Sequence, residues 1–172
     1  MLAPVPTYLQ LIAEGRPGTR CDVTPIFADA AAFAEVLADL AALAAPYEHE
    51  YVAGIDALGF ILGAALAARE GKGFIAIRKG GKLPVPAKRV EFVDYTGEPK
   101  SLELRADAFA AGSRILLIDE WIETAAQVGA SIELIERQRG LVIAIACINC
   151  DSNPRTDALR ERYPVLQLMP RG

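Results

Sequence analysis

An apolar segment that stops at two adjacent acidic residues constrains the fold of this chain more than any other feature. Residues 114–127 read RILLIDEWIETAAQ. Every position from Ile115 to Ile118 is apolar, which is typical of a parallel strand covered by helices on both faces. Ligands of such sheets bind beyond the carboxyl ends of the strands. Asp119 and Glu120 follow this strand directly, so we expect them at the place where a ligand binds.

Paired carboxylates in that position suit two kinds of ligand. They can accept hydrogen bonds from two neighbouring sugar hydroxyls, or they can hold a hydrated divalent ion. A solvated acidic turn without a ligand is the alternative, and the pattern alone leaves both interpretations open.

Strand and helix patterns alternate along most of the chain. Residues 28–45 are rich in Ala, Leu and Phe at helical spacing and end before Pro46, which predicts one long helix. We expect strands near Tyr51, Phe74, Ile115 and Leu141, and a last strand at residues 165–168. This alternation predicts an α/β fold with a doubly wound, mainly parallel sheet flanked by helices. Its length of 172 residues fits a single domain, residues 1–172, with an N-terminal arm at residues 1–20.

Composition excludes several classes of protein. A hydrophobic content of 52% excludes a disordered chain. The net charge of −4 argues against a broad basic surface for nucleic acid, so any phosphate must be bound locally. The longest apolar stretches are interrupted well before the length of a membrane span, and the N-terminus lacks the pattern of a secretion signal. We expect a cytoplasmic protein that binds neither nucleic acid nor membrane.

The cysteines and the single histidine give little support for a metal or redox centre. Cys147 and Cys150 form a CxxC, but this pair follows a strand pattern and has the composition of a loop, whereas reactive pairs usually open a helix. A structural zinc needs about four ligands. A redox or metal role of this pair stays a minor alternative. We expect His49, in the charged stretch YEHEY, at the surface.

A second segment supplies a pattern that is recognisable as a whole. Residues 51–84 read YVAGIDALGFILGAALAAREGKGFIAIRKGGKLP, which predicts a short strand, a loop at Asp56, a helix from Gly59, a strand at Phe74 to Ile77 and a basic turn. Together with residues 114–127, this segment resembles the adenine phosphoribosyltransferases of the type I phosphoribosyltransferase family. The resemblance runs from about Pro17 to the C-terminus. It implies the type I phosphoribosyltransferase fold, a flexible hood loop and a homodimer.

The resemblance also implies a reaction and its ligands. The family works in purine salvage and joins a base to phosphoribosyl pyrophosphate, which gives a nucleotide and pyrophosphate, with Mg²⁺. By resemblance, Asp119 and Glu120 match the paired acids that bind ribose, with the second changed from Asp to Glu. Arg78, Lys79 and Lys82 match the basic turn that receives pyrophosphate. The expected partner is therefore a small nucleotide or sugar phosphate, and no residue is assigned as a metal ligand.

Residues 84–100, PVPAKRVEFVDYTGEPK, interrupt the alternation of strands and helices. A stretch of that length without a helix is usually functional or mobile, and the alternative is an exposed hairpin that contacts a partner subunit. By resemblance, this segment is the hood that closes over the substrates and excludes water. Asp94 and Tyr95 then match a catalytic Glu-Tyr pair near the base.

Two other positions depart from the family's pattern. The segment PGTRCDVTP resembles the base-binding turn, but Arg20 and Cys21 stand where the family has an apolar or aromatic residue and an Arg. Leu58 stands where the family has an Arg that contacts pyrophosphate.

The phosphate cradle departs most from the pattern. The family places Thr-Gly-Gly-Thr at a helix N-terminus, where backbone N–H groups and the helix dipole receive the 5′-phosphate. The corresponding segment here contains Glu123, Thr124, Ala125, Ala126 and Gln127. Thr124 and Gln127 have the spacing of a capping box, so we predict that the helix begins near Thr124 and satisfies its own donors. Glu123 would repel a phosphate.

These departures leave alternatives open. One is a phosphoribosyltransferase with an altered base site and an altered phosphate site. Another is a non-catalytic ligand-binding or regulatory protein of the same fold, which keeps a ligand at the acidic pair and the basic turn. A structural homodimer without a ligand is the third.

Overall fold

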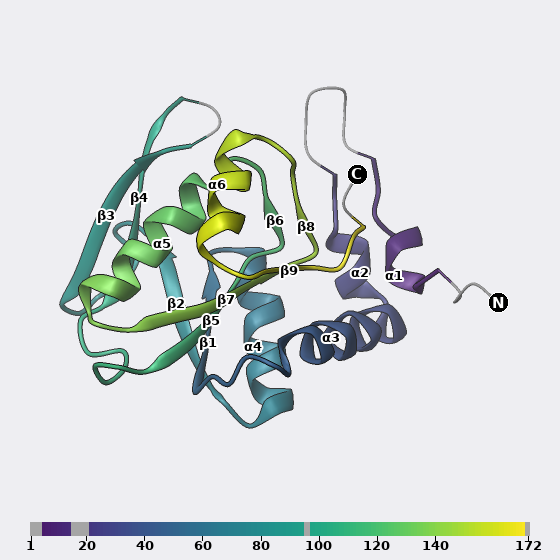
Figure 1. Cartoon of the computed structure of the whole chain (residues 1–172), viewed down its shortest axis with the longest axis horizontal. Helices are drawn as coiled ribbons and strands as arrows, with labels where there is room; N and C mark the ends of the chain where they lie inside the picture. The colour runs from purple at the N-terminus through teal and green to yellow at the C-terminus, as the bar shows by residue number, and fades with distance from the viewer. Residues whose placement is uncertain (1–4, 15–20, 95–96, 171–172) are drawn as a thin grey trace.

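A seven-stranded sheet with helices on both faces forms the core of the protein (Figure 1). The structure is a computed structural model, and it describes residues 5–14, 21–94 and 97–170. Its elements are, in chain order, α1 (Thr7–Gln10), α2 (Thr24–Ala28), α3 (Ala30–Ala44), β1 (Tyr51–Ile55), α4 (Leu58–Glu70), β2 (Gly73–Lys79), β3 (Ala87–Val93), β4 (Pro99–Arg105), β5 (Arg114–Ile118), β6 (Trp121–Ile122), α5 (Ala126–Arg137), β7 (Leu141–Cys147), β8 (Asn149–Cys150), α6 (Pro154–Arg162) and β9 (Val165–Gln167).

The sheet is mainly parallel, as the alternating pattern predicts. Its strand order is β3-β4-β2-β1-β5-β7-β9. The neighbours from β2 to β9 pair in parallel, whereas β4 pairs antiparallel with both β2 and β3. The chain moves outward from β1 to β2 on one side and from β5 to β7 on the other. Strands β1 and β5 therefore flank the switch point of the topology, where ligands of open α/β sheets bind.

Strand β5 is buried on both faces. Ile115 and Leu117 pack into the core that α5 covers, and Leu116 and Ile118 pack into the core that α3 and α4 cover. Figure 1 shows α5 and these two helices on opposite sides of the sheet. All four side chains are fully buried, so the interpretation of this segment as a central parallel strand is confirmed.

The helices follow the expected pattern with one change of boundary. Extended backbone at Asp29 separates α2 from α3, and the Asp29 carboxylate caps α3 by accepting from the N–H groups of Ala31 and Ala32. The predicted single helix over residues 28–45 therefore begins only at Ala30. Among the described residues, every helix is too short or too polar to span a bilayer.

Most of the predicted hood is an antiparallel hairpin and not an irregular loop. Strands β3 and β4 pair along their whole lengths, from Ala87 opposite Arg105 to Val93 opposite Pro99. Val90 and Leu102 are buried against the core beneath α5, and alternate residues on β3 face solvent. This hairpin geometry was the alternative interpretation of residues 84–100. Closure of the hood over a ligand stays a prediction.

Two local predictions were wrong. His49 is buried. Its Nδ1 lies 2.8 Å from the Tyr47 carbonyl oxygen, and its Nε2 lies 2.8 Å from Glu70 Oε2. The charged neighbours of His49 concealed this contact with the end of α4. The predicted loop at the CxxC is mostly strand, since Cys147 ends β7 and Cys150 lies in β8. Both thiols are buried, and neither forms a disulfide within the described residues.

Candidate functional site

The acidic pair lies at the carboxyl end of β5 and is buried. The exposed fractions of Asp119 and Glu120 are 3% and 5%, so the interpretation as a solvated acidic turn is wrong. Asp119 Oδ1 accepts from the Glu120 N–H over 3.0 Å, and Oδ2 accepts from the Gln127 side-chain amide over 3.1 Å. Burial raises the pKa of Asp119 well above its ordinary value of 3.8, and the neighbouring carboxylate of Glu120 raises it further. Ligand hydroxyls or a cation would stabilise the charged form of such a pair.

A short parallel ladder holds the segment that follows the acids. Trp121 and Ile122 form β6, which pairs with Asn149 and Cys150 of β8. The Trp121 indole N–H donates to Asp151 Oδ1 over 3.0 Å. This ladder leaves no local signal in the sequence, because each strand has only two residues and the pairing joins positions 28 apart.

The start of helix α5 differs from the predicted capping box. The helix begins at Ala126, its N-cap residue Ala125 has a left-handed backbone with φ of 58°, and no described side chain caps it. Gln127 is therefore the second helical residue, whereas a capping box needs it at the third. Its amide reaches Asp119 and not the helix end. The prediction that Thr124 and Gln127 satisfy the helix donors is wrong.

A pocket lies at this helix start and joins most of the predicted site. Asp119, Lys79 and Asp94 line it together with the cradle segment. Its full lining is Lys79, Asp94, Lys100, Asp119, Trp121, Ile122, Glu123, Thr124, Ala125, Ala126, Gln127 and Val128. Asp94 forms an ion pair with Lys100 across the hairpin. The other predicted catalytic residue, Tyr95, lies outside the described residues.

Of the three cations of the basic turn, one lines this pocket. Arg78 and Lys79 end β2, and Lys79 lines the pocket, whereas Arg78 and Lys82 are absent from its lining. Arg78 Nε lies 3.5 Å from Asp56 Oδ2 without forming a hydrogen bond. Glu103, which the sequence analysis did not single out, holds the turn from beneath by accepting from three backbone N–H groups.

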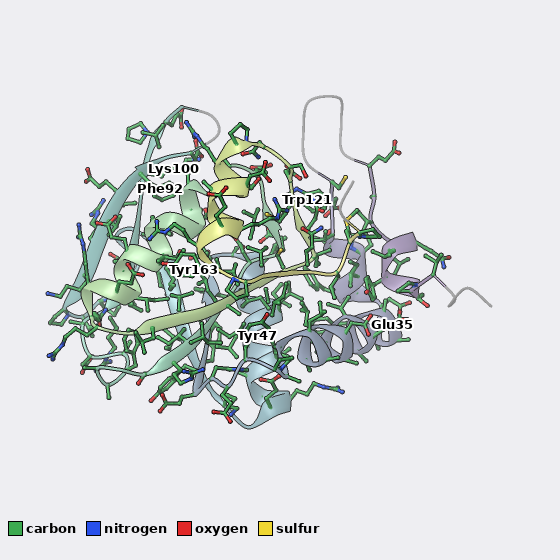
Figure 2. The ribbon with its side chains drawn as sticks, viewed as in Figure 1. Glu35, Tyr47, Phe92, Lys100, Trp121 and Tyr163 are labelled. Carbon is green, nitrogen blue, oxygen red and sulfur yellow. The ribbon has the colours of Figure 1, made fainter. Side chains whose placement is uncertain are left out.

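A second hollow lies on the other side of Trp121. It is lined by Cys21, Asp22, Val23, Thr24, Leu58, Glu120 and Trp121. The structure therefore places Cys21 beside the second acid of the pair, while Arg20 lies outside the described residues. Trp121 borders both hollows. Figure 2 shows its side chain toward α2 and Lys100 on the side of the hairpin.

The donor set fits magnesium in one particular mode. Within the described ranges, no group of three or more His, Cys, Asp or Glu side chains could form a metal cage. Mg²⁺ is usually held by one or two carboxylates together with substrate phosphates. Asp119 and Glu120 are two adjacent buried carboxylates, and they match that requirement.

Comparison with known proteins defines the class of this chain. No family model matches it. The adenine phosphoribosyltransferase of Kineococcus radiotolerans is 44% identical over 127 residues, which are 74% of this chain and 68% of that relative. Among solved structures, adenine phosphoribosyltransferase from Thermoanaerobacter pseudethanolicus has a TM-score of 0.87 at 29% identity and covers 94% of this chain and 96% of that one. The Giardia lamblia enzyme complexed with 9-deazaadenine has a TM-score of 0.79 at 26% identity and covers 88% of each chain.

These likenesses establish the type I phosphoribosyltransferase fold, with its mainly parallel sheet flanked by helices. The chain belongs to the adenine phosphoribosyltransferase family. The matched segments span about two thirds of the length of the first curated relatives.

Proposed function

We propose that this chain is a purine phosphoribosyltransferase, which transfers ribose 5-phosphate from phosphoribosyl pyrophosphate to a purine and releases pyrophosphate. One observation carries the proposal. Asp119, buried at the switch point of the sheet, shares a pocket with Lys79 and with a helix start that no described side chain caps. A sugar that bears two anionic groups needs this combination of acceptors, cations and N–H donors.

The ribose and its 5′-phosphate would occupy the first pocket. Asp119 and Glu120 would accept hydrogen bonds from the ribose hydroxyls. These hydroxyls are neutral donors, so they can satisfy two carboxylates that lie together. The 5′-phosphate would bind at the start of α5, where the helix dipole favours an anion. Ala125 supports this role, because its left-handed backbone reproduces a conformation that glycine adopts most readily.

The pyrophosphate would bind at the basic turn. Lys79 lines the pocket, and Arg78 and Lys82 flank it in sequence. Mg²⁺, held by Asp119, Glu120 and substrate oxygens, would supply charge neutralisation for the leaving group. The arginine that the family pattern has at Leu58 is absent, so this chain relies more heavily on the cations of the turn.

The purine would occupy the second hollow, against Trp121 and near Cys21 and the predicted contact Arg20. The flat indole suits stacking against a purine. The 9-deazaadenine bound to the Giardia relative supports a purine in this family. The hairpin would then act as the hood, with Asp94 and Tyr95 near the base. In this proposal Asp94 must exchange its Lys100 partner for the substrate.

A specific observation favours a second function, a non-catalytic protein that binds a ligand in the same pocket. Glu123 lines the pocket at the place proposed for the 5′-phosphate. A carboxylate about 4 Å from a phosphate costs at most roughly 4 kcal/mol per unit charge at an effective dielectric near 20. Such repulsion would weaken binding of the sugar phosphate and slow transfer.

Calorimetry followed by a turnover assay distinguishes these functions. We expect the wild type to bind phosphoribosyl pyrophosphate with magnesium and to form a nucleotide from adenine. Asp119→Asn should weaken binding at least tenfold, whereas the matched control Asp107→Asn, which changes an exposed carboxylate outside both hollows, should leave it unchanged. Binding without turnover would support the second function. Absence of binding would contradict both.

The proposal includes the assembly and location expected from the sequence. We propose a homodimer of this single-domain chain in the cytoplasm, with a small-molecule substrate and without nucleic acid or membrane as partner. Sedimentation velocity at micromolar concentration tests the assembly, and a chain that remains monomeric would contradict it.

A further inference from the structure

A buried carboxylate supports the basic turn from beneath. Glu103 lies on β4, and its exposed fraction is 7%. Its Oε2 accepts from the Gly81 N–H over 3.0 Å, and its Oε1 accepts from the N–H groups of Lys82 and Leu83. One side chain thus satisfies three successive backbone donors of a turn that follows β2.

We infer that Glu103 is a positioning residue for anion binding at residues 78–83, through its hold on the backbone of that turn. The inference rests on the proposed function, in which this turn receives the pyrophosphate group. Glu103 itself does not touch the ligand in this arrangement. It acts through Lys82, from whose backbone N–H it accepts, and through the turn that continues from Lys79 at the end of β2.

The hydrogen bonds of Glu103 also determine how the turn can bind an anion. Successive N–H groups that point into one concavity form a site for anions in many proteins. Here Glu103 already fills that concavity, so the N–H groups of Gly81, Lys82 and Leu83 are engaged. Recognition of pyrophosphate must therefore come from the lysine and arginine side chains. Each of these long side chains loses rotamer entropy when it binds the anion. A mobile backbone would add to that cost, so binding depends on a backbone that is already fixed.

Charge surrounds Glu103 in the sheet as well. In the strand register, Glu103 lies opposite Arg78 on β2 and opposite Arg89 on β3. Burial raises the pKa of the Glu103 carboxyl, but the backbone donors of the turn and Arg89 outweigh burial and hold the pKa below its ordinary value. The Glu103 carboxylate therefore stays ionised to a lower pH than an ordinary glutamate.

The turn also contacts the hairpin at Gly80. The Gly80 N–H donates to the Ser101 carbonyl oxygen over 2.9 Å. A Cβ atom at Gly80 would lie 2.1 Å from Ser101 Oγ and 3.2 Å from Arg89 Nη2. The hydrogen bonds of Glu103 and this close approach both attach the turn to β3 and β4. A movement of the hairpin would therefore carry the basic turn with it.

Glu103→Gln tests the inference with little change in shape. The amide offers one acceptor oxygen and turns a donor toward the N–H groups of the turn, so at least one hydrogen bond is lost. We expect magnesium pyrophosphate to bind at least tenfold more weakly in calorimetry. The affinity for ribose 5-phosphate should stay within about twofold, because that ligand uses the other end of the pocket. Glu91→Gln, an exposed glutamate on β3 of the same hairpin, is the matched control and should change neither affinity.

A second variant and a second measurement separate positioning from folding. Gly80→Ala should weaken pyrophosphate binding in the same way, because the added methyl displaces the Ser101 hydroxyl and the Arg89 guanidinium that lie against the turn. Hydrogen exchange of the amides of Gly81, Lys82 and Leu83 should accelerate at least tenfold in Glu103→Gln, with the exchange of β5 unchanged. In kinetics, the KM for phosphoribosyl pyrophosphate should rise while kcat at saturation changes little.

Three results would overturn the inference. The first is faster exchange in the turn together with unchanged pyrophosphate affinity, and the second is exchange that does not respond to Glu103→Gln. The third is an equal loss of affinity for pyrophosphate and ribose 5-phosphate, which would assign Glu103 a general structural role. If the wild type binds no pyrophosphate, the proposed function fails, and the positioning role for that ligand fails with it. The exchange measurement then still reports whether Glu103 shapes the turn.

Discussion

The side-chain amide of Gln127 donates to Oδ2 of Asp119 over 3.1 Å, so the second residue of α5 contacts the acidic pair directly. The Glu120 N–H occupies Oδ1 of the same carboxylate. Gln127 orients Asp119 and favours its ionised form, although burial and Glu120 together raise the pKa.

Gln127→Ala should destabilise the protein more at alkaline pH than at acid pH. A hydrogen bond to a charged buried group contributes about 1.5–3 kcal/mol, so we expect a loss in this range at pH 8. At pH 5 the loss should be smaller, since more of Asp119 is then protonated. Urea denaturation measures both values. In an Asp119→Asn background the same change should cost less, and an equal cost in both backgrounds would show that the two side chains are not coupled.

The pH dependence of stability should reveal the buried acid. The pKa of Asp119 is raised above 3.8, so between 3.8 and the raised value the folded state binds more protons than the unfolded state. The contribution of this group to the free energy of unfolding is complete below 3.8 and is lost as the pH rises through the folded pKa. Asp119→Asn should therefore stabilise the protein increasingly as the pH rises above 3.8 and through the raised pKa of the folded state. The exposed control Asp107→Asn should not reproduce this trend.

Ala125→Gly should stabilise the protein, although glycine usually weakens structure. A left-handed backbone costs a non-glycine residue about 1–2 kcal/mol, and glycine removes that cost at the expense of a more flexible unfolded chain. We expect a net gain of up to about 1 kcal/mol in chemical denaturation. The neighbouring change Ala126→Gly, at the first helical position, should destabilise by up to about 1 kcal/mol. Opposite signs for these adjacent substitutions would verify the backbone at the cradle.

Glu123→Gln should tighten the binding of sugar phosphates. The substitution removes the repulsion between the carboxylate and the phosphate. About one third of the maximal repulsion already corresponds to a roughly tenfold change in affinity. We expect ribose 5-phosphate to bind about tenfold more tightly in calorimetry. Glu133→Gln, an exposed change on α5 that pairs with Arg137, serves as the control. Weaker binding after Glu123→Gln would identify this glutamate as a working part of the ligand site.

Intrinsic fluorescence should report ligand binding directly. Trp121 is the only tryptophan of the chain, and it borders both hollows. A purine stacked on the indole should quench its emission, whereas ribose 5-phosphate alone should have a smaller effect. Asp151→Ala removes the acceptor of the indole N–H and should shift the emission of the ligand-free protein. An emission that stays constant during saturation with a bound purine would contradict the proposed base site.

The sequence predicts the elements whose signal is local. The apolar run of β5 and the acids that follow it are contiguous, so the strand, its burial and the position of Asp119 could be inferred without coordinates. The strands at Tyr51, Phe74 and Leu141 follow from similar runs. These features depend on hydrophobic periodicity, which a single sequence contains in full.

The features that were missed depend on contacts between distant residues. Glu103 lies about twenty residues from the turn that it holds, and an isolated glutamate in a strand gives no signal for that role. Gln127 had the spacing of a capping residue, but the left-handed turn at Ala125 moved the N-cap by one position, from Thr124 to Ala125. Local spacing could not reveal this turn, because alanine rarely adopts that conformation.

The pairing of β6 with β8 has a consequence for any transplant of the ligand loop. Trp121 lies opposite Asn149 in this ladder, and the Asn153 amide donates to the Glu123 carbonyl oxygen over 2.7 Å while its Oδ1 caps α6. The loop after β5 and the segment before α6 therefore hold each other in shape, and a transplant must include both. A chimaera that exchanges residues 119–127 with those of a relative should keep its shape only when residues 149–153 are exchanged with them.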